Sequence, residues 1–90
     1  MIRILLAEDH QIVLDGLKLV LKEHQEIQIV GEANNGQEVL KILEKTPVNI
    51  AILDIEMPVM DGIETATEIL DRYPDTKVLM LTMYNEQAFI

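Results

Sequence analysis

The 90-residue sequence contains no cysteine, which excludes disulfide bonds, thiolate metal sites and cysteine nucleophiles. Its only aromatic residues are Phe89, Tyr73 and Tyr84, so we expect a core built from Ile, Leu, Val and Met. No apolar run is long enough to span a bilayer, and the first apolar residues lead into Glu8-Asp9, unlike a signal peptide. We therefore expect a cytoplasmic protein that does not insert into membranes.

Positive charge is also scarce, because 7 basic residues stand against 16 acidic ones and the net charge is −9. Such a charge repels phosphate backbones and anionic lipids, so direct binding to nucleic acid or to a membrane surface is not expected. It favours cationic partners, including divalent metal ions. Apolar residues make up 49% of the chain, which is enough for the core of one domain.

Apolar patterns predict strands that alternate with helices along the chain. The predicted strands are 2–7, 27–32, 50–53 and 78–81, and the predicted helices are about 10–23, 37–45 and 63–73. Their core stripes are Val13, Leu17, Val20 and Leu21; Val39, Leu40 and Leu43; and Ile63, Ala66, Ile69, Leu70 and Tyr73.

Strands and helices in this alternation imply a doubly wound α/β fold with a parallel sheet. The continuously apolar first, third and fourth strands are expected to be covered on both faces, whereas the alternating strand 27–32 suits a sheet edge. The predicted strand order is therefore 2-1-3-4. Residues 78–81 are too apolar for a comfortable open edge, so we expect either a fifth strand beyond it or a homodimer formed through that edge.

Four side chains with useful chemistry end strands of this predicted sheet: Glu8, Asp9, Asp54 and Thr82. The carboxyl ends of the first and third strands are neighbours, so three carboxylates are expected to converge. Their crowding is unfavourable without a cation, and oxygen ligands of this kind suit Mg²⁺. Asp54 is the candidate nucleophile, since an aspartate can form an acyl phosphate, and Thr82 could donate its hydroxyl to the phosphoryl group.

Each of these residues also has a simpler interpretation. An aspartate at a strand end is usually a loop or capping residue, and a Glu-Asp pair often caps a helix. Thr82 alone is more typical of a strand end, and His10 and His24 are interpreted as a loop residue and a helix-end residue rather than as ligands. The ordered combination is more specific than any of its members.

The motifs Leu5-Leu6-Ala7-Glu8-Asp9-His10, Leu53-Asp54-Ile55-Glu56-Met57-Pro58, Asp61-Gly62 and Leu81-Thr82 make the chain similar to bacterial response-regulator receiver domains. Residues 30–36 (Val-Gly-Glu-Ala-Asn-Asn-Gly) resemble the NarL/FixJ class, in which a DNA-binding helix-turn-helix domain normally follows. The resemblance implies a flavodoxin-like fold and a phosphoacceptor that is switched by a sensor histidine kinase and regulates transcription through the output domain.

The resemblance also implies roles for single residues. Asp54 corresponds to the phosphorylated aspartate, and Thr82 to the switch hydroxyl. Mg²⁺ would be bound by Asp9 and Asp54, by Glu8 through water, and by the backbone carbonyl of Glu56. The side chains of Glu56 and Tyr84 would affect the lifetime of the phosphorylated form.

Residues 1–90 are expected to form a single, partial receiver domain, without the family's fifth strand, its lysine and its last helix. One alternative is a fragment that cannot accept a phosphoryl group and only binds metal or self-associates. The other is a phosphohydrolase, because Asp54-Ile55-Glu56 resembles the Asp-x-Asp motif of haloacid-dehalogenase-type phosphatases. That class places its nucleophile after the first strand, where this chain has Glu8-Asp9, so a signalling phosphoacceptor rather than a turnover enzyme is favoured.

Overall fold

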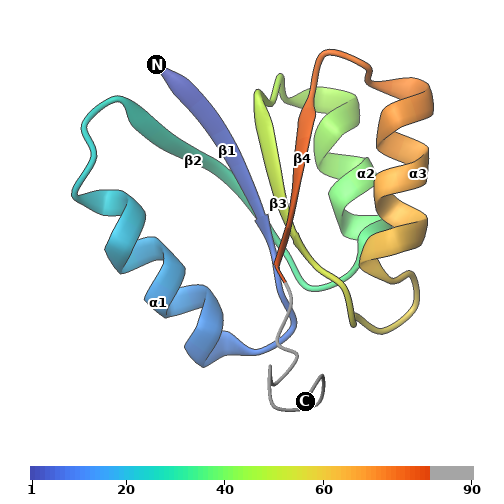
Figure 1. Cartoon of the computed structure of the whole chain (residues 1–90), viewed down its shortest axis with the longest axis horizontal. Helices are drawn as coiled ribbons and strands as arrows, with labels where there is room; N and C mark the ends of the chain where they lie inside the picture. Colours follow the sequence, from blue (N-terminus) through green and yellow to red (C-terminus); the bar gives the residue numbers. More distant parts are fainter. Residues whose placement is uncertain (82–90) are drawn as a thin grey trace, which may run out of the picture.

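The computed structural model describes residues 1–81, in which four strands alternate with three helices (Figure 1). All strand pairs are parallel, and the order β2-β1-β3-β4 confirms the predicted α/β fold. The elements are β1 (Ile2–Ala7), α1 (Gln11–Lys22), β2 (Ile27–Ala33), α2 (Gly36–Lys45), β3 (Ile50–Asp54), α3 (Gly62–Arg72) and β4 (Lys77–Leu81).

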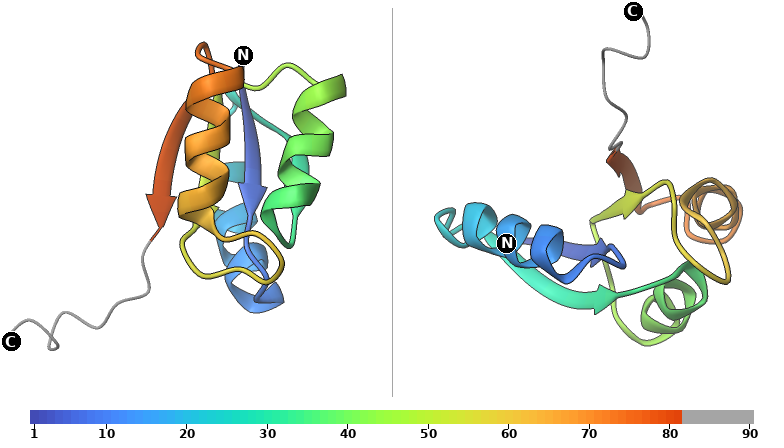
Figure 2. Two further views of the ribbon diagram at one scale, coloured as in Figure 1. Left: turned by 90° about the vertical axis from the view of Figure 1, so that its right-hand side faces the viewer. Right: turned by 90° about the horizontal axis from the view of Figure 1, so that it is seen from below.

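The helices cover the two faces of the sheet unequally. Helix α1 lies on one face, whereas α2 and α3 lie side by side on the other (Figures 1 and 2). Alternate residues of the central strand β1 enter the two cores: Leu5 belongs to the cluster with Val39 and Ile69, and Leu6 to the cluster with Leu14. These side chains are buried, so the predicted aliphatic core is confirmed.

Both helices on the shared face begin at a side-chain cap. Asn35 precedes α2 and its Oδ1 accepts a hydrogen bond from the Glu38 N–H at 3.0 Å. Asp61 precedes α3 and forms a capping box with Glu64, in which each side chain accepts from the other residue's backbone N–H. Caps of this kind satisfy N–H groups that the helix itself leaves free. They also fix where the loops from β2 and β3 enter their helices.

Three residues assigned to helix core stripes are exposed, which corrects the prediction. Val20 is 62% exposed, Ile63 60% and Leu70 65%. In α1 the buried residues form a narrow stripe that is displaced from the predicted one: Leu14, which was not assigned to the stripe, is 2% exposed, and the partly buried Leu17 and Leu21 continue its i, i+3, i+7 spacing. One helix against a sheet face buries only that narrow stripe.

The expectation that β4 is covered on both faces was wrong. Its residues Val78 and Met80 pack against the cluster under α2 and α3. On the other face Leu79 is 54% exposed, because α1 lies over the β1–β2 side of the sheet and does not reach it (Figure 1). Within residues 1–81, β4 is therefore an edge strand with one uncovered apolar side chain. No helix in this part of the chain is both long enough and apolar enough to cross a membrane.

Candidate functional site

Parallel pairing of β1 with β3 brings the predicted acidic residues together at the carboxyl ends of these strands. Ala7 pairs with Leu53, so Glu8 and Asp54 occupy equivalent positions at the carboxyl ends of neighbouring strands. Asp54 in turn pairs with Leu81, the last residue of β4. The predicted switch residue Thr82 follows Leu81 and, like Tyr84, lies outside the described residues.

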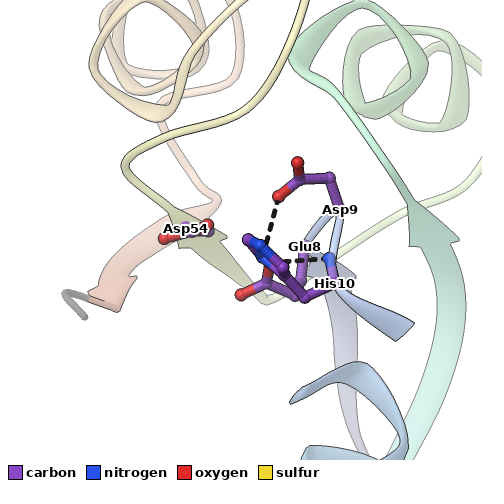
Figure 3. Close-up of side chains that lie close together, drawn as sticks. All are labelled: Glu8, Asp9, His10 and Asp54. Carbon is purple, nitrogen blue, oxygen red and sulfur yellow. Dashed lines mark hydrogen bonds and ion pairs between the residues drawn. The ribbon is translucent and has the colours of Figure 1, made fainter. Parts of the chain in front are cut away.

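Four side chains from these strand ends form a tight group: Glu8, Asp9, His10 and Asp54 (Figure 3). Each offers a nitrogen or carboxylate oxygen, and these atoms all lie within 4.8 Å of one another. Glu8 is fully buried and Asp54 is 3% exposed. The predicted convergence of three carboxylates is therefore confirmed.

His10, which was interpreted as a loop residue rather than as a ligand, lies in the loop before α1 as expected, and its side chain also belongs to this group. Its Nδ1 lies 2.9 Å from Glu8 Oε2 and 3.2 Å from Asp9 Oδ1 (Figure 3). The backbone N–H of His10 also donates to Glu8 Oε2 at 2.9 Å. The signal available in the sequence was its position two residues after Glu8, which allows the chain to turn the ring back onto that carboxylate.

Burial, hydrogen bonds and charges within the group shift three pKa values. The hydrogen bond with Glu8 raises the pKa of His10, and the charges of Asp9 and Glu8 raise it further. Burial alone acts to raise the pKa of Glu8, but the hydrogen bonds from the backbone and ring of His10 outweigh it and lower that pKa. For Asp54, burial and then the negative charge of Glu8 raise the pKa, and together they outweigh the backbone hydrogen bond from Ile55, which acts to lower it.

One buried oxygen in the group suits a cation. Glu8 Oε1 has no hydrogen-bond partner among the described residues, although the residue is fully buried. A buried carboxylate oxygen left unpaired is costly, and a bound cation would remove that cost. Oxygen ligands from Glu8, Asp9 and Asp54 match the preference of Mg²⁺ for carboxylates and water. The residues present therefore fit a divalent metal ion.

The loop between β3 and α3 forms the other wall of the site. A cleft of about 560 Å³ lies between this loop and the β1 end, and it is lined by Asp9, His10, Ile55, Glu56, Met57, Pro58 and Asp61. Gly62 closes the loop, because its N–H donates to the Ile55 carbonyl at 2.8 Å. A Cβ on Gly62 would lie 2.1 Å from the Asp54 carbonyl oxygen, so only glycine allows this approach. Inside the loop, Val59 has a positive φ of 69°.

Comparison with known proteins identifies the family. The family model described as "Response regulator receiver domain" matches residues 4–90. The chain is 35% identical over 88 residues to the uncharacterized transcriptional regulatory protein YhcZ of Bacillus subtilis, covering 98% of this chain and 41% of YhcZ. It is 32% identical over 89 residues to the response regulator GacA of Pseudomonas aeruginosa, covering 99% of this chain and 42% of GacA.

A solved structure shows the same fold. The non-phosphorylated receiver domain of RcsB from Escherichia coli superposes with a TM-score of 0.86 at 30% identity, covering 97% of this chain and 69% of that one. GacA and RcsB are of the NarL/FixJ class, which confirms the class predicted from residues 30–36. The chain spans about two-fifths of the length of the curated relatives it matches. It belongs to the family of receiver domains of two-component response regulators.

Proposed function

We propose that Asp54 accepts a phosphoryl group from a sensor histidine kinase in a Mg²⁺-dependent reaction. The observation that carries the proposal is the group of Glu8, Asp9 and Asp54 at the ends of neighbouring strands, with one buried oxygen of Glu8 unpaired. An aspartate among charged side chains does not by itself indicate a particular reaction. An aspartate beside a site built for a divalent cation suits phosphoryl transfer in particular.

In the proposed reaction an oxygen of Asp54 attacks the phosphorus of a phosphohistidine on the kinase. The new P–O bond forms as the P–N bond breaks, and the kinase imidazole leaves and takes up a proton. Bound to Glu8 through water, to Asp9, Asp54 and the Glu56 carbonyl, Mg²⁺ would offset the negative charge on the phosphoryl oxygens. This chain's own contribution is to hold Asp54 at a buried strand end beside the open cleft that the β3–α3 loop lines.

The phosphorylated form would act as a signal in the cytoplasm. It would not be an intermediate in the cycle of a turnover enzyme. Thr82 would respond to the phosphoryl group as the switch hydroxyl. A relative supports the coupling to DNA: RcsB from Salmonella enterica serovar Typhimurium was solved bound to promoter rprA in the presence of the phosphomimetic BeF3−. By analogy, phosphorylation here would control a helix-turn-helix output domain that binds DNA.

Exposed Leu79 favours a second role for the 90-residue chain. Its side chain is 54% exposed on edge strand β4, and an apolar strand edge can pair with a second copy. The chain studied alone is expected to form a homodimer through this edge. Sedimentation over a range of concentrations tests this, with Leu79→Lys as the variant that should remain monomeric. Wild-type protein that stays monomeric at every concentration would contradict the role.

Incubation with acetyl phosphate and Mg²⁺ separates the candidate functions. A phosphoacceptor forms an adduct that is cleaved by base and by hydroxylamine, as an acyl phosphate is, that depends on Mg²⁺ and that is lost in Asp54→Asn. Steady release of phosphate without an adduct would instead indicate the phosphohydrolase. Metal binding without either product would indicate a chain that binds Mg²⁺ but does not accept a phosphoryl group.

A further inference from the structure

We infer that the turn after β2 together with the first residue of α2, Asn34–Gly36, is a brace that holds the two walls of the metal site together, and that Asn34 is a positioning residue for Mg²⁺. The inference rests on the proposed metal site and adds a residue that does not itself belong to the acidic group. The turn contacts both the end of β1 and the β3–α3 loop.

The first contact fixes the peptide that joins Glu8 to Asp9. The Asn34 side-chain amide donates from Nδ2 to the Glu8 carbonyl at 3.2 Å. One residue earlier, the Ala33 carbonyl accepts from the Glu8 N–H at 3.0 Å. Both backbone polar groups of Glu8 are therefore held, one by Ala33 at the end of β2 and the other by Asn34 in the turn that follows. Because the Glu8 carbonyl lies in the peptide before Asp9, its orientation sets the direction in which Asp9 projects.

The second contact fixes the loop on the other side of the cleft. The Gly36 N–H donates to the Met60 carbonyl at 2.9 Å. The approach is close: a Cβ on Gly36 would lie 1.9 Å from Thr65 Oγ1 and 2.9 Å from the Met60 oxygen. Met60 belongs to the same loop as Glu56, whose carbonyl is a proposed ligand. The turn thus fixes that loop relative to the end of β1.

The brace is itself anchored to α2 independently of the Asn34 side chain. The backbone N–H of Asn34 donates to Glu38 Oε1 at 2.9 Å, and Asn35 Oδ1 accepts from the Glu38 N–H at 3.0 Å. Removing the side-chain amide of Asn34 therefore leaves the helix cap in place. What is lost is the single bond to Glu8, which makes the role of Asn34 in metal binding separable from its role in folding.

Titration calorimetry with Mg²⁺ tests the inference in Asn34→Ala, with the thermal midpoint in EDTA as the measure of folding. We expect the Kd for Mg²⁺ to rise about tenfold, the smaller end of the effect of removing a group that orients a metal ligand. The matched control is Thr76→Val. Thr76 Oγ1 donates to the Val48 carbonyl at 2.8 Å. This buried residue lies at the amino ends of β3 and β4, whereas the metal site lies at the carboxyl ends of the strands. This control should lower the midpoint and leave the Kd unchanged.

A second variant separates lost orientation from altered charge. Asn34→Asp keeps the shape of the side chain but cannot donate to the Glu8 carbonyl. Its added negative charge alone would tighten binding of a cation, so weaker Mg²⁺ binding in this variant supports the brace. Tighter or unchanged binding in Asn34→Asp, a wild-type Kd in Asn34→Ala, or equal weakening in Thr76→Val would overturn it. If wild-type protein gives no binding heat, the proposed metal site itself fails, which is a different result.

Discussion

The clearest energetic consequence of the site is that Asp54→Asn should stabilise the metal-free protein. Asp54 and Glu8 are both buried, and their oxygens lie within 4.8 Å of each other. Burial and the charge of Glu8 raise the pKa of Asp54, so its ionised form is unfavourable in the folded state. Asparagine has nearly the same shape and no charge, and it removes this repulsion.

The size of the effect follows from the separation of the two carboxylates. Their oxygens lie no more than 4.8 Å apart, and two unit charges at that upper limit repel by about 3 kcal/mol at an effective dielectric constant of about 20. His10 offsets part of this repulsion, because its Nδ1 lies 2.9 Å from Glu8 Oε2. We expect a net gain of about 1 kcal/mol, which raises the thermal midpoint of a domain of this size by about 4–8 °C.

The effect has a defined pH dependence. A carboxyl whose pKa is raised on folding destabilises the protein at pH values above the folded pKa. The penalty disappears as the pH falls below the ordinary value of 3.8, where Asp54 is protonated in both states. In EDTA, the stabilisation of the protein by Asp54→Asn should therefore be complete at pH 7 and should disappear at pH values below 3.8.

Calorimetric scans of wild type, Asp54→Asn and a control with the same change in net charge provide the assay. Asp75→Asn is that control, because Asp75 is an exposed turn residue outside the acidic group. An unchanged or lower midpoint for Asp54→Asn in EDTA, or an equal rise in Asp75→Asn, would refute the argument from crowded carboxylates.

Three further predictions concern the metal and the backbone. Mg²⁺ should raise the thermal midpoint of the wild type as ligands of the native state do, and Asp9→Asn should abolish the rise; an undiminished shift would show that Asp9 is not a ligand. Gly62→Ala should lower the free energy of unfolding by about 2–4 kcal/mol in urea titrations, because the new Cβ would meet the Asp54 carbonyl at 2.1 Å. Gly16→Ala should instead raise it by about 1 kcal/mol, since a Cβ there meets nothing within 4 Å in the middle of α1; equal effects of the two substitutions would contradict this account.

The element order and the acidic site could be predicted because both depend on local pattern. Each apolar run ends in a polar or turn residue, so the strands stood out, and the alternation of β2 placed it at the edge. The convergence of Glu8 with Asp54 then followed from one rule, that neighbouring parallel strands end at the same edge. The strands nevertheless extend one residue beyond the predicted bounds at Ala33, Asp54 and Lys77, because backbone pairing continues past the residues whose apolar pattern defined each strand.

The features that could not be predicted depend on distances between segments. The predicted burial of the helix faces was wrong at Val20, Ile63 and Leu70, and the buried Leu14 was missed, because periodicity alone does not fix which residues of a helix the neighbouring elements cover. The ring of His10 reaches Glu8 through a turn whose geometry a sequence does not state. The contact of Gly36 with Met60 joins loops that are 24 residues apart (60 minus 36), and no local pattern reports it.

The central claim is that Asp54 is the residue that accepts the phosphoryl group. Treatment with acetyl phosphate and Mg²⁺, followed by reduction with borohydride, converts an aspartyl phosphate to homoserine and so marks the residue chemically. Peptide sequencing by mass spectrometry should then find homoserine at position 54 in the wild type, and nowhere in Asp54→Asn or in a sample treated with EDTA. Homoserine at Asp9 or Asp61 instead, or at no position after treatment with Mg²⁺, would contradict the claim.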